Sequence, residues 1–324
     1  MGSAQPFDGK EDVKHMKNIK HILICGAGMM GKNIGFVFAS NPDFQVGMYD
    51  LYPTDVEAGI RTNTKQLVEK GVITEEELAD RLSRISFTND IDSDIVKNAD
   101  LVIEAVFEDM KIKRETFAKL EERCAEDTIF CTNSSVMSPS EISAELKHRE
   151  RFVGTHFWNP GHLIPLVEVV KSDASSDETA QTVMEVLRSV GKRPVLCKKD
   201  VPGFIANRMQ HALWREAISI VENGIADAAT VDEAVRYSFG LRLPQLGPME
   251  NADMVGTDLT YNIHDYILQD LEDSHKPSPL LKQLRDEGKI GFKTGSGFQK
   301  WTPEQVAKSN ADLNEYLIRM LYGK

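Results

Sequence analysis

The sequence has few cysteines, no basic stripe and no long apolar run. Its four cysteines are scattered without a Cys-x-x-Cys pair, at positions 25, 124, 131 and 197. This spacing argues against a disulfide framework or a cysteine metal site, and favours reduced thiols in a cytoplasmic protein. The net charge is −12 and no dense lysine and arginine cluster appears, which argues against a nucleic-acid partner. No apolar run is long enough to cross a membrane.

The length and composition fit an ordinary globular protein. With 324 residues, of which 41% are hydrophobic, the chain is long enough for two domains with substantial cores. Residues 1–19 mix charges of both signs without an apolar segment, so we expect a disordered or loosely docked tail there. We divide the remainder into a first domain over residues 20–200 and a second over residues 201–324.

Short apolar runs alternate with longer amphipathic ones in the first domain, as is typical of a parallel sheet with helices on both faces. They predict strands over 21–25, 44–49, 101–104, 128–132, 152–156, 166–170 and 193–197. Past Val201 long helical patterns take over. We therefore expect an α/β domain followed by an all-helical one, with a substrate cleft between them.

Helix starts are indicated where a serine or threonine precedes a glutamate by three residues, the spacing of a capping box. Such pairs begin at Thr74, Ser138, Ser175 and Thr230. We expect each of these four residues to be the N-cap of a helix.

The stretch from His21 to Gly31 joins an apolar run to glycines spaced as Gly-x-Gly-x-x-Gly. We expect a strand and a tight turn at Gly26, backbone close to a pyrophosphate at Gly28, and helix packing at Gly31. Asp50 follows 19 residues beyond Gly31, where a carboxylate can accept hydrogen bonds from a ribose and would repel the extra phosphate of NADP. The motif predicts bound NAD.

Hydride transfer to or from a carbon also requires a group that moves the proton on the neighbouring oxygen. His156 ends an apolar run before an Asn-Pro turn, a suitable place to face a cleft. Glu168 lies inside the run 166–170, where burial requires a partner, and a short connection would let it pair with His156. On spacing alone, an exposed Glu168 and a hydrogen-bonded turn histidine fit equally well.

The segment Thr132-Asn133-Ser134-Ser135 ends another apolar run. Its polar groups would face the same cleft, or would merely cap the helix after Pro139. Local pattern alone leaves both interpretations open.

Six ordered motifs resemble those of the L-3-hydroxyacyl-CoA dehydrogenases. They are 26–31, 101–108, 132–135, 156–160, 166–170 and 200–208. The resemblance implies a Rossmann-type NAD-binding domain followed by a helical domain. It implies an oxidoreductase that interconverts a secondary 3-hydroxy compound and its 3-oxo form, and a homodimer formed through the helical domain.

By the same resemblance, His156 is the general acid/base and Glu168 the carboxylate that orients it. Ser135 and Asn207 would hydrogen-bond the reacting oxygen and the substrate carbonyl. The cofactor contacts implied are Gly26, Gly28, Met29, Met30, Gly31, Asp50, Glu108, Lys113, Ser135, Asn159 and Lys293. No metal is implied.

The chain departs from the CoA-using members of the family just before the 166–170 run. Ile164-Pro165 stands where those members usually have a lysine, and Gly161-His162 precedes it. This pattern resembles the branch with L-gulonate dehydrogenase (lambda-crystallin), carnitine dehydrogenase and a pyridine-carboxylate dehydrogenase of vitamin B6 breakdown. Those relatives act on small hydroxy compounds, so we favour a small hydroxy acid or alcohol without CoA.

The helix expected near 54–70 is where the family usually meets the CoA nucleotide. Its Arg61 and Lys65 share a stripe with Glu57 and Glu69, so surface ion pairs are the simpler interpretation. Lys70 lies off this stripe, near the lysine position of CoA-using relatives. It supports the alternative substrate, a short-chain 3-hydroxyacyl-CoA of fatty acid metabolism.

Two other classes of protein remain as alternatives. A non-enzymatic NAD-binding or crystallin-like structural protein would place no demand on Ser135, His156, Glu168 and Asn207. A flavin or methyl-donor protein fits Asp50 but leaves the histidine and glutamate unexplained.

Overall fold

The structure is a computed structural model in which residues 18–324 are described. The predicted tail over residues 1–19 lies almost wholly outside them. Two compact units make up the chain, one of residues up to Ile205 together with Asn314–Lys324, and one of Ala206–Leu313. No helix in the described part of the chain is long and apolar enough to cross a membrane.

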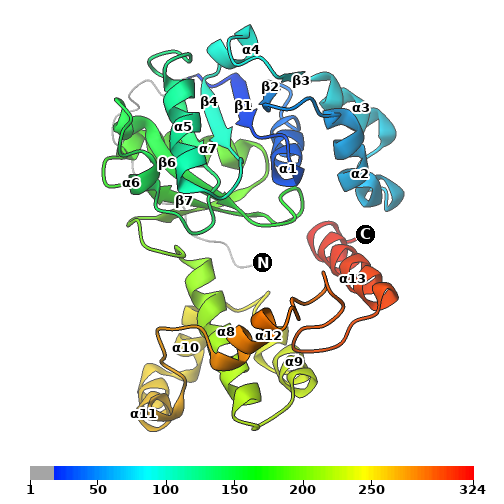
Figure 1. The fold of residues 1–324 in the computed structure, drawn as a ribbon, viewed down its shortest axis with the longest axis vertical. Helices are drawn as coiled ribbons and strands as arrows, with labels where there is room; N and C mark the ends of the chain where they lie inside the picture. Colours follow the sequence, from blue (N-terminus) through cyan, green and yellow to red (C-terminus); the bar gives the residue numbers. More distant parts are fainter. Residues whose placement is uncertain (1–17) are drawn as a thin grey trace. The chain divides into compact units, whose positions relative to one another are not determined.

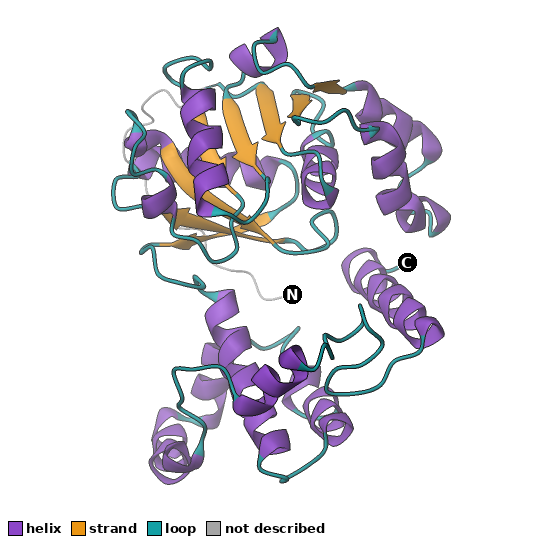
Figure 2. Cartoon of the chain, in the orientation of Figure 1, coloured by secondary structure: helices purple, strands orange, loops and turns teal. Residues whose placement is uncertain are grey.

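The first unit is built on one eight-stranded sheet, in the spatial order β3-β2-β1-β4-β5-β6-β7-β8 (Figures 1 and 2). The strands are β1 His21–Cys25, β2 Gln45–Tyr49, β3 Ile85–Thr88, β4 Leu101–Glu104, β5 Ile129–Thr132, β6 Phe152–Phe157, β7 Leu166–Lys171 and β8 Arg193–Cys197. Strands β1 to β6 are parallel, in the 3-2-1-4-5-6 order of a Rossmann-type domain. Their carboxyl ends meet at one edge, where folds of this class bind dinucleotides.

The predicted parallel arrangement holds for β1 to β6 but not for the last two strands. β7 is antiparallel to β6, and β8 is parallel to β7. The cause is the connection from β6 to β7, which contains no helix, whereas a parallel neighbour needs a long crossover. The reversal brings the first residues of β7 to the edge where β6 ends.

The sequence prediction also missed β3. This strand, Ile-Ser-Phe-Thr, lies at the edge of the sheet and is only partly buried. It therefore lacks the continuous apolar run by which the buried strands were recognised.

Helices cover both faces of the sheet, so the residues of its central strands β4, β5 and β6 are buried whichever face they point to. Along β1, Ile22 and Ile24 pack into one core cluster, while Leu23 and Cys25 pack into the other. The first cluster includes side chains of α1 Met29–Phe38, α2 Val56–Glu69, α3 Glu75–Ser83 and α7 Asp177–Ser189. The second includes side chains of α4 Asp94–Lys97, α5 Met110–Glu121 and α6 Pro139–Ile142. Figure 1 shows α5 and α7 on opposite sides of the sheet.

Two of the four predicted N-caps are confirmed. Thr74 and Glu77 form both hydrogen bonds of a capping box, and Ser138 accepts a hydrogen bond from the Glu141 N–H. The prediction is wrong by one residue at Ser175, because its hydroxyl bonds the Phe152 carbonyl and Ser176 caps α7 instead.

The N-cap predicted at Thr230 is also wrong. The helix α9 begins earlier, at Ala228, because the Asp227 carboxylate accepts the hydrogen bond from the Thr230 N–H.

Helices and loops make up the second unit (Figure 2). Its helices are α8 Ala206–Glu222, α9 Ala228–Arg236, α10 Pro248–Val255, α11 Thr257–Ile267, α12 Pro279–Asp286 and the first part of α13 Pro303–Tyr322. The expectation of a helical second domain is confirmed. Asn207 is the sole buried residue of 206–313, and none of this unit's apolar side chains is buried.

Candidate active site

The loop from β1 to α1 has the backbone that the glycine motif predicts. Gly26 has a φ of +106°, and a Cβ atom there would lie 2.6 Å from the Ala105 carbonyl oxygen. A Cβ at Gly31 would lie 1.8 Å from the Gly26 carbonyl oxygen, so a side chain would push the helix off the loop. A Cβ at Gly28, the N-cap of α1, meets nothing within 4 Å. Space therefore remains for an anionic group beside the helix N-terminus, as bound pyrophosphate requires.

Asp50 follows β2 and lies against this glycine loop. Its Oδ2 accepts a hydrogen bond from the Ala27 N–H at 2.8 Å, and its Oδ1 accepts one from the Tyr52 N–H at 3.1 Å. The two bonds fix the carboxylate at the carboxyl edge of the sheet, and each oxygen retains acceptor capacity for a ribose hydroxyl.

The Glu108 side chain lies at the same edge, in the loop after β4. Its Oε1 accepts hydrogen bonds from the Ser134 hydroxyl at 2.5 Å and the Ser135 N–H at 3.0 Å. Although partial burial opposes ionisation, the Ser134 hydrogen bond and the Lys113 charge lower the pKa of Glu108 below its usual value. Glu108 is therefore an anion that ties the ends of β4 and β5 together.

Lys113 is almost fully buried between two carboxylates. Its Nζ lies 2.7 Å from Glu104 Oε1 and 3.1 Å from Glu108 Oε2. Burial raises the pKa of Glu104, opposed by the Lys113 charge and by hydrogen bonds from Lys113 and Thr132. With two of its three N–H donors used, the ammonium retains one for a further partner.

His156 and Glu168 face one another across β6 and β7. They are paired residues in the antiparallel register, and the distance from His156 Nδ1 to Glu168 Oε2 is 2.8 Å. The two side chains are 5% and 0% exposed, so the hydrogen bond is shielded from water. With the carboxylate ionised, Nδ1 carries the proton and Nε2 has a lone pair. Spacing alone did not decide whether these two residues pair. In the structure they do.

Two further donors hold the Glu168 carboxylate. The Ile205 N–H donates to Oε1 at 2.9 Å, and the Trp158 Nε1–H lies 3.4 Å from Oε2. Both carboxylate oxygens are therefore engaged, which stabilises the ionised form of a fully buried glutamate.

Aromatic rings enclose the imidazole. The ring centroids of Trp158 and Phe204 lie 5.2 and 5.8 Å from that of His156. Phe204 is buried and has a φ of +50°, an uncommon conformation for a residue with a side chain. The segment Gly203–Ile205 thus positions both an aromatic ring and the backbone donor to Glu168.

The remaining predicted site residues lie in different places. Ser135 and Asn159 are exposed, Ser135 in the loop after β5 and Asn159 after β6, before a cis peptide bond to Pro160. Asn207 and Lys293 belong to the second unit, where Asn207 is buried on α8 and Lys293 is exposed in a loop.

Asn133 belongs to the polar segment 132–135 that the sequence singled out, and its Oδ1 accepts a hydrogen bond from the Phe157 N–H at 2.9 Å. This bond links the end of β5 to the residue after His156.

His162 lies in the β6–β7 loop and is mostly buried. Burial, with the nearby charge of Lys192, lowers the pKa of His162 to about 4. The imidazole is therefore neutral at pH 7, so it contributes no fixed positive charge.

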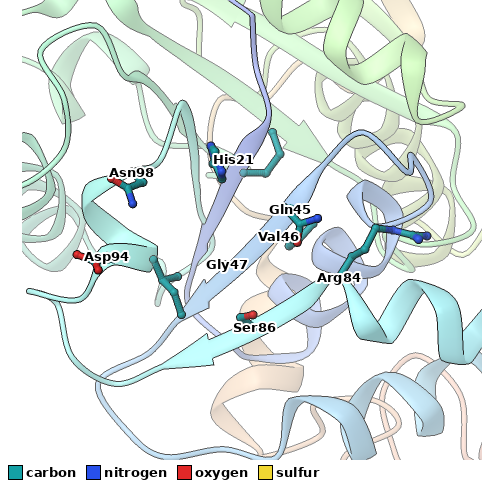
Figure 3. A pocket seen from close by; sticks show the side chains of 10 residues that line it. His21, Gln45, Val46, Gly47, Arg84, Ser86, Asp94 and Asn98 are labelled. Carbon is teal, nitrogen blue, oxygen red and sulfur yellow. The ribbon is translucent and has the colours of Figure 1, made fainter.

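The cavity in Figure 3 is separate from this edge. It has a volume of about 220 Å³ and is lined by His21, Gln45 and Arg84, among others. These residues start or directly precede β1, β2 and β3. The cavity thus lies at the amino ends of the strands, opposite the glycine loop and Asp50.

Two models of one protein family together match most of the chain. Residues 21–201 match the 3-hydroxyacyl-CoA dehydrogenase NAD binding domain, and residues 203–301 match the C-terminal domain of the same family. The chain belongs to the 3-hydroxyacyl-CoA dehydrogenase family, and it is an NAD-dependent dehydrogenase that acts on hydroxyl groups. The alternatives of a structural protein and of a flavin or methyl-donor protein find no support in these matches.

Two named relatives differ in substrate. The chain is 33% identical over 312 residues to 5-formyl-3-hydroxy-2-methylpyridine 4-carboxylate 5-dehydrogenase from Mesorhizobium japonicum, covering 94% of this chain and 99% of that protein. It is 35% identical over 292 residues to human mitochondrial hydroxyacyl-coenzyme A dehydrogenase, covering 87% and 91%.

Solved structures repeat this contrast. A structure of 5-formyl-3-hydroxy-2-methylpyridine 4-carboxylic acid 5-dehydrogenase, described as an NAD⁺-dependent dismutase, matches with a TM-score of 0.86 at 32% identity, over 95% of this chain and 100% of that one. (S)-3-hydroxybutyryl-CoA dehydrogenase from Ralstonia eutropha matches with a TM-score of 0.74 at 29% identity, over 88% and 100%.

Proposed function

We propose that His156 is the general acid/base of the reaction and that Glu168 orients it. The observation that carries this proposal is the buried 2.8 Å hydrogen bond from His156 Nδ1 to Glu168 Oε2. It fixes the tautomer in which Nε2 accepts the hydroxyl proton of the substrate, and the carboxylate then stabilises the imidazolium. Acid/base assistance of this kind contributes on the order of 10² to 10⁴ in rate.

Bound NAD would accept the hydride that leaves the carbinol carbon. The residues proposed to hold it are Gly26, Gly28, Met29, Met30, Gly31, Asp50, Glu108, Lys113, Ser135, Asn159 and Lys293. The open space at Gly28 and the fixed Asp50 carboxylate fit a pyrophosphate and a ribose. Ser135 and Asn207 would hydrogen-bond the reacting oxygen and the substrate carbonyl.

For the substrate we favour a small hydroxy acid or alcohol without CoA. Arg61 and Lys65 on α2 pair with Glu57 and Glu69, at 2.9 and 3.5 Å. These cations are therefore already neutralised by carboxylates on the same helix, and a CoA phosphate would have to compete for them. The higher TM-score with the pyridine-carboxylate dehydrogenase supports the same choice.

Lys70 was the residue that favoured a CoA thioester. Its Nζ lies 3.0 Å from Glu315 Oε1, so it too has a carboxylate partner. A short-chain 3-hydroxyacyl-CoA remains the second candidate because named relatives with similar identity use CoA substrates. A role in fatty acid metabolism belongs to that second candidate alone.

We also propose a cytoplasmic homodimer formed through the helical unit. In that unit the side chains of Trp214, Tyr261 and Met254 are 48%, 70% and 71% exposed, and no apolar side chain is buried. A helical unit without a buried core of its own is stabilised when a second copy covers its apolar faces. Sedimentation velocity would give the mass of two chains if this proposal is correct, and of one chain if it is wrong.

The substrate proposal is tested by NADH oxidation with acetoacetyl-CoA beside a panel of free keto acids and aldehydes. We expect turnover of a compound without CoA at a higher kcat/KM. A kcat/KM for acetoacetyl-CoA above about 10⁵ M⁻¹s⁻¹, the ordinary enzymatic range, would overturn the choice.

A further inference from the structure

Lys192 is a lysine in an unusual environment. It directly precedes β8, is 7% exposed, and within the described residues it forms no ion pair with a carboxylate. Burial lowers its pKa to about 8, so it is still mostly an ammonium at pH 7. A buried charge without a counter-ion is costly unless its hydrogen bonds are satisfied.

The partners of this ammonium are two carbonyl oxygens of one loop. Nζ donates to the Gly161 oxygen at 2.6 Å and to the Ile164 oxygen at 2.8 Å. It also lies 5.9 Å from the centroid of the Phe157 ring, at the end of β6. The loop 158–165 joins the strand of His156 to the strand of Glu168, so Lys192 binds the connection between the two paired residues.

The same loop packs tightly on the helix that follows the glycine motif. A Cβ atom at Gly161 would lie 3.3 Å from Asn33 Cβ and 3.4 Å from Met30 Cε, both side chains of α1. At its other end the loop carries Trp158, whose indole reaches Glu168. A displacement of the loop would therefore act on α1 and on the Glu168 carboxylate together.

We propose that Lys192 is a positioning residue for the dehydrogenase reaction. Its ammonium holds the loop 158–165 in the conformation that packs on α1 and keeps Trp158 at Glu168. Its contacts are with the two loop carbonyls and the Phe157 ring, so it acts through the loop. Removal of the ammonium leaves two carbonyl oxygens without their donor and releases the loop.

The test uses Trp158 as a reporter of the loop. In a full-length Trp214→Phe/Trp301→Phe background, Trp158 is the single tryptophan, and its acrylamide quenching constant measures how well the loop is held. We expect Lys192→Met, which keeps the length of the side chain but not its donors, to raise this constant at least twofold. We also expect at least a threefold increase in the Kd for NADH.

The matched control is Lys171→Met. Lys171 ends β7 and pairs with the Asp177 carboxylate at 2.5 Å instead of with the loop. This variant should change neither the quenching constant nor the Kd for NADH by more than a factor of 1.5.

A second variant tests the loop if Lys192→Met fails to fold. Gly161→Ala leaves Lys192 in place but adds a methyl group where the loop meets α1, and it should raise the quenching constant as well. The proposal is overturned if folded Lys192→Met keeps the parental quenching constant, or if Gly161→Ala leaves it unchanged. Neither readout requires a substrate, so the result is independent of the substrate proposal.

Discussion

His156 and Glu168 are directly opposite one another on β6 and β7, with 2.8 Å between Nδ1 and Oε2. This relationship exists because β7 reverses direction after a short loop, so that a residue near the start of β7 meets one near the end of β6. Both side chains are buried, so the hydrogen bond between them satisfies polar atoms that water does not reach.

Glu168→Gln should lower kcat by about tenfold, less than removal of the histidine. The amide has one acceptor oxygen, whereas the carboxylate accepts at both oxygens, from the Ile205 N–H and from the imidazole. The variant also removes the negative charge that stabilises the imidazolium, so the pH profile of kcat/KM should shift. A profile that coincides with that of the parent enzyme would show that Glu168 does not act on His156 electrostatically.

NAD should be preferred over NADP by at least tenfold in kcat/KM. The Asp50 carboxylate is fixed against the glycine loop, so a 2′-phosphate would have to approach a negative charge. A tenfold preference requires only about 1.4 kcal/mol, which such a repulsion readily supplies. Asp50→Asn should reduce the preference.

Asp55→Asn is the matched control for this measurement. Asp55 lies near Asp50 in the sequence, but its side chain caps α2 by accepting from the Ala58 N–H. The preference should be unchanged in this control. Equal rates of the parent enzyme with both cofactors would contradict the assignment to Asp50.

His162 should make the protein less stable in mild acid. Burial, followed by the Lys192 charge, lowers its pKa from 6.5 to about 4, so the unfolded chain binds a proton between these values that the folded protein does not. Stability is therefore lost as the pH falls below 6.5, by about 2 kcal/mol between pH 7.5 and 5. We expect urea unfolding of His162→Gln to show a smaller decrease than the parent.

His275→Gln, at an exposed histidine of the second unit, is the control for the acid effect. Its stability should fall with pH as that of the parent does. If His162→Gln loses as much stability between pH 7.5 and 5 as the parent, the acid sensitivity arises elsewhere.

The features that the sequence predicts well are those with a local pattern. The glycine motif, the buried strands and Asp50 could be recognised because turn geometry and burial on both sheet faces restrict the residue types allowed. The pairing of His156 with Glu168 was only one of two interpretations from spacing, and it depended on the direction of β7.

Other features have no local signature. The donor from Ile205 to Glu168 is a backbone N–H, which any residue except proline would supply. Lys192 and Lys113 resemble surface lysines in the sequence, and their burial follows from neighbours distant along the chain. Ser175 has the sequence pattern of an N-cap, but its hydroxyl donates a hydrogen bond to the distant Phe152 carbonyl and does not cap the helix.

The central claim is that His156 moves the proton while NAD is held by other residues. The most direct test compares the parent enzyme with His156→Gln in two measurements, kcat with a substrate found in the panel and the Kd for NADH by fluorescence titration. We predict a loss of at least about 10² in kcat with a Kd for NADH within twofold of the parent. A His156→Gln variant that keeps its kcat would contradict the account and require another group as the base.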